Sequence, residues 1–111
     1  MAASCSFHPE ALFEYAAATN YYLSEASPRV AETFVTAIEF AIAVLVAAPE
    51  RWPVVEAPEI RRSVVSRFPF IIYYRWESPH ARVIIYAVMH SSRELMRGSR
   101  ADERGLISSR H

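Results

Sequence analysis

The residues most able to do chemistry lie in one short segment, His90-Ser91-Ser92-Arg93, which follows a long apolar run. A histidine where a buried strand opens into a polar loop can act as a general base near neutral pH. Arg93, in the polar loop, can reach outward with five donors. The alternative is a structural role, in which the His90 ring hydrogen-bonds a loop carbonyl and fixes the turn. No second catalytic group stands at a fixed spacing from this histidine.

A second set of residues combines arginines with aromatic rings. Guanidinium groups bind phosphates and rings stack on bases, so this mixture is typical of a nucleic-acid surface. Arginine stems can equally cover an aromatic sheet face and pair with acidic residues of a partner protein. The set comprises Arg61, Arg62, Arg67, Arg75, Arg82, Arg93, Arg97 and Arg100, with Tyr73, Tyr74 and Trp76 between them. From it we expect the target-binding residues to be Arg61, Arg62, Arg75, Tyr74, Arg93 and Arg97.

Other kinds of site are not indicated. The four histidines are far apart and the single cysteine stands alone, so neither a metal site nor an intrachain disulfide is expected. No glycine precedes Gly98, which excludes a glycine-rich phosphate loop. The glutamates fall mostly on helix faces, where a solvated role is expected. We expect no cofactor.

Charge is divided along the chain. Residues 1–60 carry two arginines and eight glutamates, a net −6, whereas residues 61–111 carry ten arginines and four acidic residues, a net +6. The sequence contains no lysine. This division indicates two different partners, or one anionic partner on one face.

The elements that position these residues follow from periodicity and capping. Residues 4–7 could form a short strand, and a helix is expected from Pro9, a residue that suits the first helical position. Ser27 and Pro28 then start a second helix whose apolar residues recur at i, i+3, i+4 and i+7 until Pro49. A loop over 49–59 is expected to lead to strands over 60–68, 70–76 and 82–90, the last in the centre of the sheet. The fold class is α+β, in the order β-α-α-β-β-β, with the helical hairpin on one face of a small, mainly antiparallel sheet.

The length of 111 residues predicts a single domain over 1–111, with a polar, arginine-rich tail from about residue 94. The longest apolar run, residues 41–49, is too short to span a bilayer, which takes roughly 20 residues. The first ten residues lack the pattern of a signal peptide. A cytoplasmic protein without a membrane partner is therefore expected.

This layout resembles the RelE/ParE superfamily of type II toxins over roughly residues 7 to 100. The motifs that carry the resemblance are Phe-x-Pro-Glu-Ala near the start, the pair Tyr21-Tyr22, Arg-Phe-Pro-Phe at 67–70 and Ala-Val-x-His-x-x-Arg at 87–93. The resemblance implies a growth-inhibiting toxin of a plasmid-stabilisation module. A cognate antitoxin would wrap it and hide its active surface in a hetero-oligomer.

The superfamily contains two mechanisms. RelE-like members cleave mRNA on the ribosome with basic residues on the sheet, whereas ParE-like members poison DNA gyrase. Here the strand position of a RelE-like catalytic arginine falls in the apolar run Phe-Ile-Ile-Tyr-Tyr, and Ser91 or Ser92 stands where a basic residue would follow the last strand. We therefore expect the ParE-like branch. The alternatives are an mRNA endonuclease using His90, Arg93 and Arg67, and an inactive relative that only binds its antitoxin.

Overall fold

Two proline-started helices follow the first strand in the computed structural model, which describes residues 3–56 and 59–96. Helix α1 spans Pro9–Glu25, and the Nδ1 atom of His8 caps it by accepting the backbone N–H of Glu10 at 3.1 Å. Helix α2 spans Pro28–Ala47, and the Ser27 hydroxyl accepts the N–H of Val30 at 3.1 Å. Both caps satisfy donors that a helix start leaves open, so the helical hairpin predicted from the sequence is confirmed.

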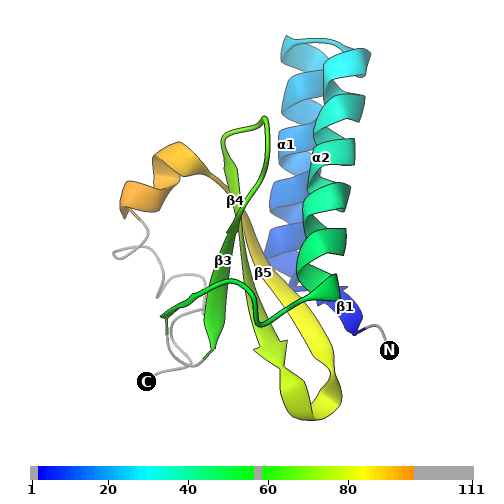
Figure 1. Cartoon of the computed structure of the whole chain (residues 1–111). Coiled ribbons are helices and arrows are strands. Elements are labelled where there is room, and N and C mark those ends of the chain that lie inside the picture. Colours follow the sequence, from blue (N-terminus) through cyan, green and yellow to red (C-terminus); the bar gives the residue numbers. More distant parts are fainter. Residues whose placement is uncertain (1–2, 57–58, 97–111) are drawn as a thin grey trace.

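A five-stranded sheet lies beside this hairpin. Its order is β1-β5-β4-β3-β2; β1 runs parallel to β5 and the other neighbours are antiparallel. The helices stand on one side of it (Figure 1). The bounds are β1 Ser4–Phe7, β2 Val54–Glu56, β3 Ile60–Val64, β4 Phe70–Glu77 and β5 Arg82–His90. The predicted α+β fold is confirmed, with two differences: β2 forms an added edge strand in the expected loop, and β3 ends at Val64 instead of residue 68.

The main core fills the space between the helices and the sheet. Phe34 of α2 is fully buried and packs against the rings of Tyr15, Tyr22, Phe68 and Phe70. Burial of a side chain of this size stabilises the fold by about 1.5–3 kcal/mol. The aromatic turn between β3 and β4 is thereby fixed against the hairpin.

An irregularity in β5 decides which residues face the helices. Tyr73 of β4 pairs with Ala87, but Tyr74 pairs with Ile85, so Tyr86 is an extra residue in β5. After this bulge the helix-facing positions pass from Val83 and Ile85 to Val88. The carboxylate of Glu14 on α1 accepts the backbone N–H of Val88 at 2.9 Å and ties the strand to the helix beyond the bulge.

Helix α2 is long and apolar enough to cross a membrane by length and composition alone, which the run at 41–49 did not suggest. In this fold one face of the helix is buried in the core, through Ala31, Phe34, Ile38, Ala41, Ile42 and Leu45. That is the pattern of a helix that packs one apolar face against a core.

Candidate functional site

The candidate residues near the end of β5 gather in what we call the His90 corner, made of Arg67, His90, Ser92 and Arg93. Phe70, the first residue of β4, pairs with His90, and the N–H of Ser91 donates to the carbonyl of Pro69 at 2.7 Å. The β3–β4 turn and the end of β5 therefore lie side by side. Arg67 sits in this turn with φ 77°, an unusual value for a non-glycine residue, and its side chain is exposed.

The His90 ring is engaged within the corner. Its Nδ1 atom accepts the backbone N–H of Ser92 at 3.1 Å and lies 2.8 Å from the Ser92 hydroxyl. The ring also meets Phe70 edge-on, with centroids 5.2 Å apart. In the neutral ring the proton therefore sits on Nε2, and the lone pair that a general base needs is already used. This geometry favours the structural role for His90.

Arg93 lies in a short 3₁₀ helix, η2, over Ser91–Met96, and its side chain is exposed. No hydrogen bond or ion pair within the described ranges, 3–56 and 59–96, holds its guanidinium. An arginine in this state can meet an anionic group of another molecule with all five donors. Arg97, also expected to bind a target, lies outside the described residues.

The sheet face opposite the helices has an apolar centre. Ile60, Ile71, Tyr73 and Ala87 form a second buried cluster there, each at most 2% exposed. Two of the expected arginines, Arg62 and Arg75, flank this cluster and are only partly buried. Among the residues described, this cluster contains no histidine, lysine or carboxylate.

Two expected target-binding residues are instead part of the interior. Tyr74 faces the helices, is fully buried, and donates its hydroxyl to the carbonyl of Pro49 at 2.6 Å. Arg61 donates to the carbonyls of Glu50 and Trp52 and forms a 3.1 Å ion pair with Glu59. Its side chain is only 12% exposed. Both residues tie the segment after α2 to the sheet, and their polar groups are used in internal hydrogen bonds.

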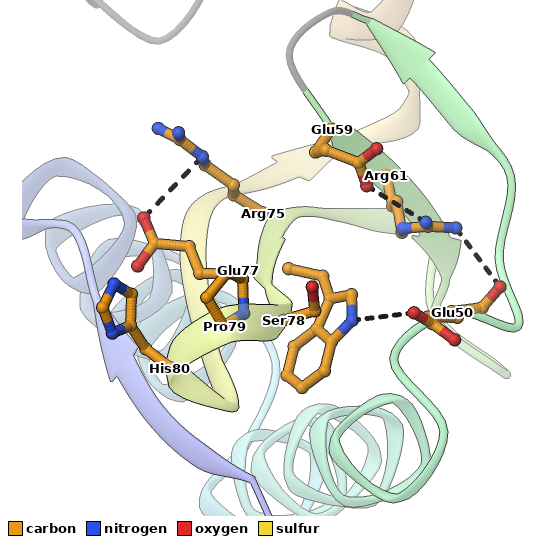
Figure 2. A pocket seen from close by; sticks show the side chains of 9 residues that line it. Glu50, Glu59, Arg61, Arg75, Glu77, Ser78, Pro79 and His80 are labelled. Atoms are coloured by element: carbon orange, nitrogen blue, oxygen red, sulfur yellow. Dashed lines mark hydrogen bonds and ion pairs between the residues drawn. The ribbon is translucent and has the colours of Figure 1, made fainter.

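A polar depression that the sequence did not reveal lies at the opposite end of β4 from the His90 corner. We call it the basal hollow; its volume is about 520 Å³ (Figure 2). Its lining residues are Glu50, Glu59, Arg61, Arg75, Trp76, Glu77, Ser78, Pro79 and His80. They come from the segment between α2 and β3, from β3 and β4, and from the turn after β4. The alternation of Arg75, Glu77 and His80 around a Ser-Pro turn was the only signal for it in the sequence.

Glu77 is the most strongly paired carboxylate of the hollow. One of its oxygens accepts from the Nε and Nη2 atoms of Arg82 at 2.9 and 2.6 Å, and the other lies 3.8 Å from the Nε of Arg75. The pKa of Glu77 is lowered, mainly because of the hydrogen bond from Arg82. No cluster of three metal-ligating side chains occurs within residues 3–56 and 59–96.

Comparison with known proteins identifies the family. The family model for the ParE toxin of the type II toxin–antitoxin system parDE matches residues 5–95. The chain belongs to the ParE toxin family. No curated protein matches the chain significantly.

Two solved structures share the ParE-type fold of this chain. A chain of the chromosomal ParDE toxin–antitoxin system from P. aeruginosa is 21% identical, with a TM-score of 0.67 over 79% of this chain and 95% of that one. A mutant of the E. coli toxin RelE in the free state is 13% identical, with a TM-score of 0.62 over 93% of this chain and 98% of that one. At 21% and 13% sequence identity, the similarity to these two structures shows a shared fold alone.

Paired substitutions can separate the two roles expected in the His90 corner, a structural role for His90 and a target-binding role for Arg93. We expect His90→Ala to lower the free energy of unfolding by about 0.5–1.5 kcal/mol, because it removes the hydrogen bond from the exposed Ser92 N–H and the ring contact with Phe70. Arg93→Ala should leave the thermal melting midpoint unchanged but weaken growth inhibition, since its exposed side chain makes no hydrogen bond or ion pair with the part of the chain that the structure describes. Melting curves and plating assays measure the two effects, with exposed Ser91→Ala as the control. An unchanged melting midpoint for His90→Ala would contradict the structural role of His90. Full toxicity of Arg93→Ala would contradict the target-binding role of Arg93.

Proposed function

We propose that this chain is the toxin of a bacterial type II toxin–antitoxin module and arrests growth by binding DNA gyrase. It would act in the cytoplasm and be neutralised by a cognate antitoxin in a hetero-oligomer, in a module of the plasmid-stabilisation type. The observation that carries the proposal is the ParE family match over residues 5–95. The ParDE system that shares the fold pairs a toxin with an antitoxin, which supports the antitoxin partner.

The side-chain geometry supports binding over cleavage. RNA cleavage in a protein site of this kind needs a positioned base and an acid or cation around the scissile phosphate. Here the lone pair of His90 Nδ1 is used by Ser92, and the centre of the open sheet face is apolar. The exposed cations Arg67 and Arg93 suit recognition of an acidic protein surface.

One observation favours a second candidate, a RelE-type mRNA endonuclease. Arg67, His90 and Arg93 lie at the same end of the sheet, because β4 begins where β5 ends. Two arginines beside a histidine could hold and cleave a phosphodiester if His90 released Ser92. In that mechanism His90→Ala would abolish activity more completely than its effect on stability explains.

The deciding experiment is controlled expression of the chain with and without its antitoxin. We expect growth arrest with the toxin alone, relief on co-expression, and inhibition of supercoiling by purified gyrase. Cleavage of ribosome-bound mRNA with normal gyrase activity would support the endonuclease instead. Normal growth at verified soluble expression would indicate the third alternative, an inactive relative that only binds an antitoxin.

A further inference from the structure

The basal hollow has two walls of opposite net charge. On one wall Glu77 pairs with two arginines: Arg75, which lines the hollow, and Arg82, which lies outside its lining. This side therefore has one positive charge in excess. On the other wall Arg61 pairs with the carboxylate of Glu59, whereas the carboxylate of Glu50 accepts from Trp76 and has no cationic partner among the described residues, which leaves one negative charge in excess. Figure 2 shows the guanidinium of Arg75 turned away from both of these carboxylates. The two excess charges therefore do not cancel each other.

Arg75 is the side chain on the positive wall that retains capacity for a ligand. Its one internal contact is the 3.8 Å approach of its Nε to Glu77, a carboxylate that Arg82 already binds through two nitrogens. The terminal amino groups of Arg75 form no hydrogen bond within the described parts of the chain, and its side chain is 34% exposed. A guanidinium in this position presents a planar pair of donors that fits a carboxylate.

The negative wall offers a complementary position. Glu50 accepts the indole N–H of Trp76 at 3.2 Å through one oxygen and is otherwise exposed. A hollow of about 520 Å³ accommodates a few side chains of a bound segment. A chain segment that carries an acidic residue and, nearby, a basic or amide residue matches both walls.

We propose that the basal hollow receives an acidic side chain of the antitoxin, which pairs with Arg75, while a donor side chain of the same segment pairs with Glu50. This inference rests on the proposed function. The residues from 61 onward carry a net +6, so a segment that neutralises this half is expected to be acidic. The hollow is a docking point separate from the His90 corner, at the other end of β4.

The first test measures the affinity of the purified chain for its antitoxin. Arg75→Gln is expected to weaken binding about tenfold and to make it less sensitive to salt. Arg75→Lys should retain part of the affinity, because the charge stays but the planar pair of donors is lost. Arg29→Gln, an exposed arginine on α2, is the matched control. Equal affinities for Arg75→Gln and Arg29→Gln, with both variants equally folded, overturn the proposal.

The second test does not require an antitoxin. The indole N–H of Trp76 reports on the hollow in an NMR spectrum, and Trp52→Phe assigns it, because the chain has only two tryptophans. An acetylated Glu-Gly-Lys amide is expected to shift this signal, the corresponding Gln-Gly-Lys peptide to shift it much less, and Arg75→Gln to abolish the effect. The proposal is contradicted if both peptides shift the Trp76 signal equally, or if inorganic phosphate alone shifts it as much as the Glu peptide does. Failure of the proposed function would appear separately, as normal growth on expression.

Discussion

Replacing Arg61 by alanine is expected to lower the free energy of unfolding by about 3 kcal/mol and the melting midpoint by roughly 10 to 20 °C. The guanidinium bridges three groups: the carbonyls of Glu50 and Trp52 and the carboxylate of Glu59. The hydrogen bond to the partly buried carbonyl of Trp52 contributes about 1.5–3 kcal/mol because its donor is charged. The exposed contacts with Glu50 and Glu59 contribute about 0–1 kcal/mol each. The Nε atom of Arg61 is buried and has no acceptor among the described residues, which reduces the stabilisation that the Arg61 side chain provides.

The control for this prediction is Arg51→Ala. Arg51 is exposed, and its guanidinium stacks 5.2 Å from the Trp52 ring, a contact that contributes about 0.5–1 kcal/mol. The melting midpoints of the two variants should therefore differ by about 10 °C. If both midpoints fall by the same small amount, Arg61 does not hold the segment after α2 onto β3.

Alkaline pH is expected to destabilise the protein through the ionisation of Tyr74 and Tyr15. Burial raises the pKa of Tyr74 from 10.0 to about 12. Between these values the unfolded chain loses this proton while the folded chain keeps it, so stability falls as pH rises. Each pKa unit corresponds to about 1.4 kcal/mol, so about 2–3 kcal/mol contributed by Tyr74 is present below pH 10 and lost by pH 12. Burial and the hydrogen bond to Glu39 also raise the pKa of Tyr15, which adds to the effect.

Urea unfolding at a series of pH values between 8 and 12 measures this dependence. Tyr74→Phe is the matched variant: it loses the hydrogen bond to Pro49, about 0.5–1.5 kcal/mol at every pH, but also loses the titrating group. Its stability should therefore decline less steeply above pH 10 than that of the unsubstituted chain. Parallel curves for the two proteins would show that Tyr74 ionises equally in both states.

The sequence by itself determined the fold class and, apart from the edge strand β2, the order of the elements. Ser27-Pro28 marked the start of α2, because a hydroxyl cap and a proline are both favourable at a helix start, and the 3.6-residue apolar period marked its buried face. The β-branched and aromatic runs marked β4 and β5. These signals are local, so they can be recognised in the sequence without knowledge of the tertiary contacts. The motifs at 67–70 and 87–93 also indicated the correct family.

Only the tertiary structure decided which side chains those elements bury. In runs that are apolar on both faces, such as Phe70–Tyr74, alternation does not identify the face that meets the helices, and the extra residue Tyr86 changes the alternation in β5. Tyr74 was therefore expected at the surface but lies in the core. Arg61 is largely buried because the segment after α2 folds back and places two backbone carbonyls against its guanidinium. The basal hollow brings together Glu50 and His80, which are thirty positions apart. Contacts of this kind depend on how separate elements meet, and no local pattern of residues encodes them.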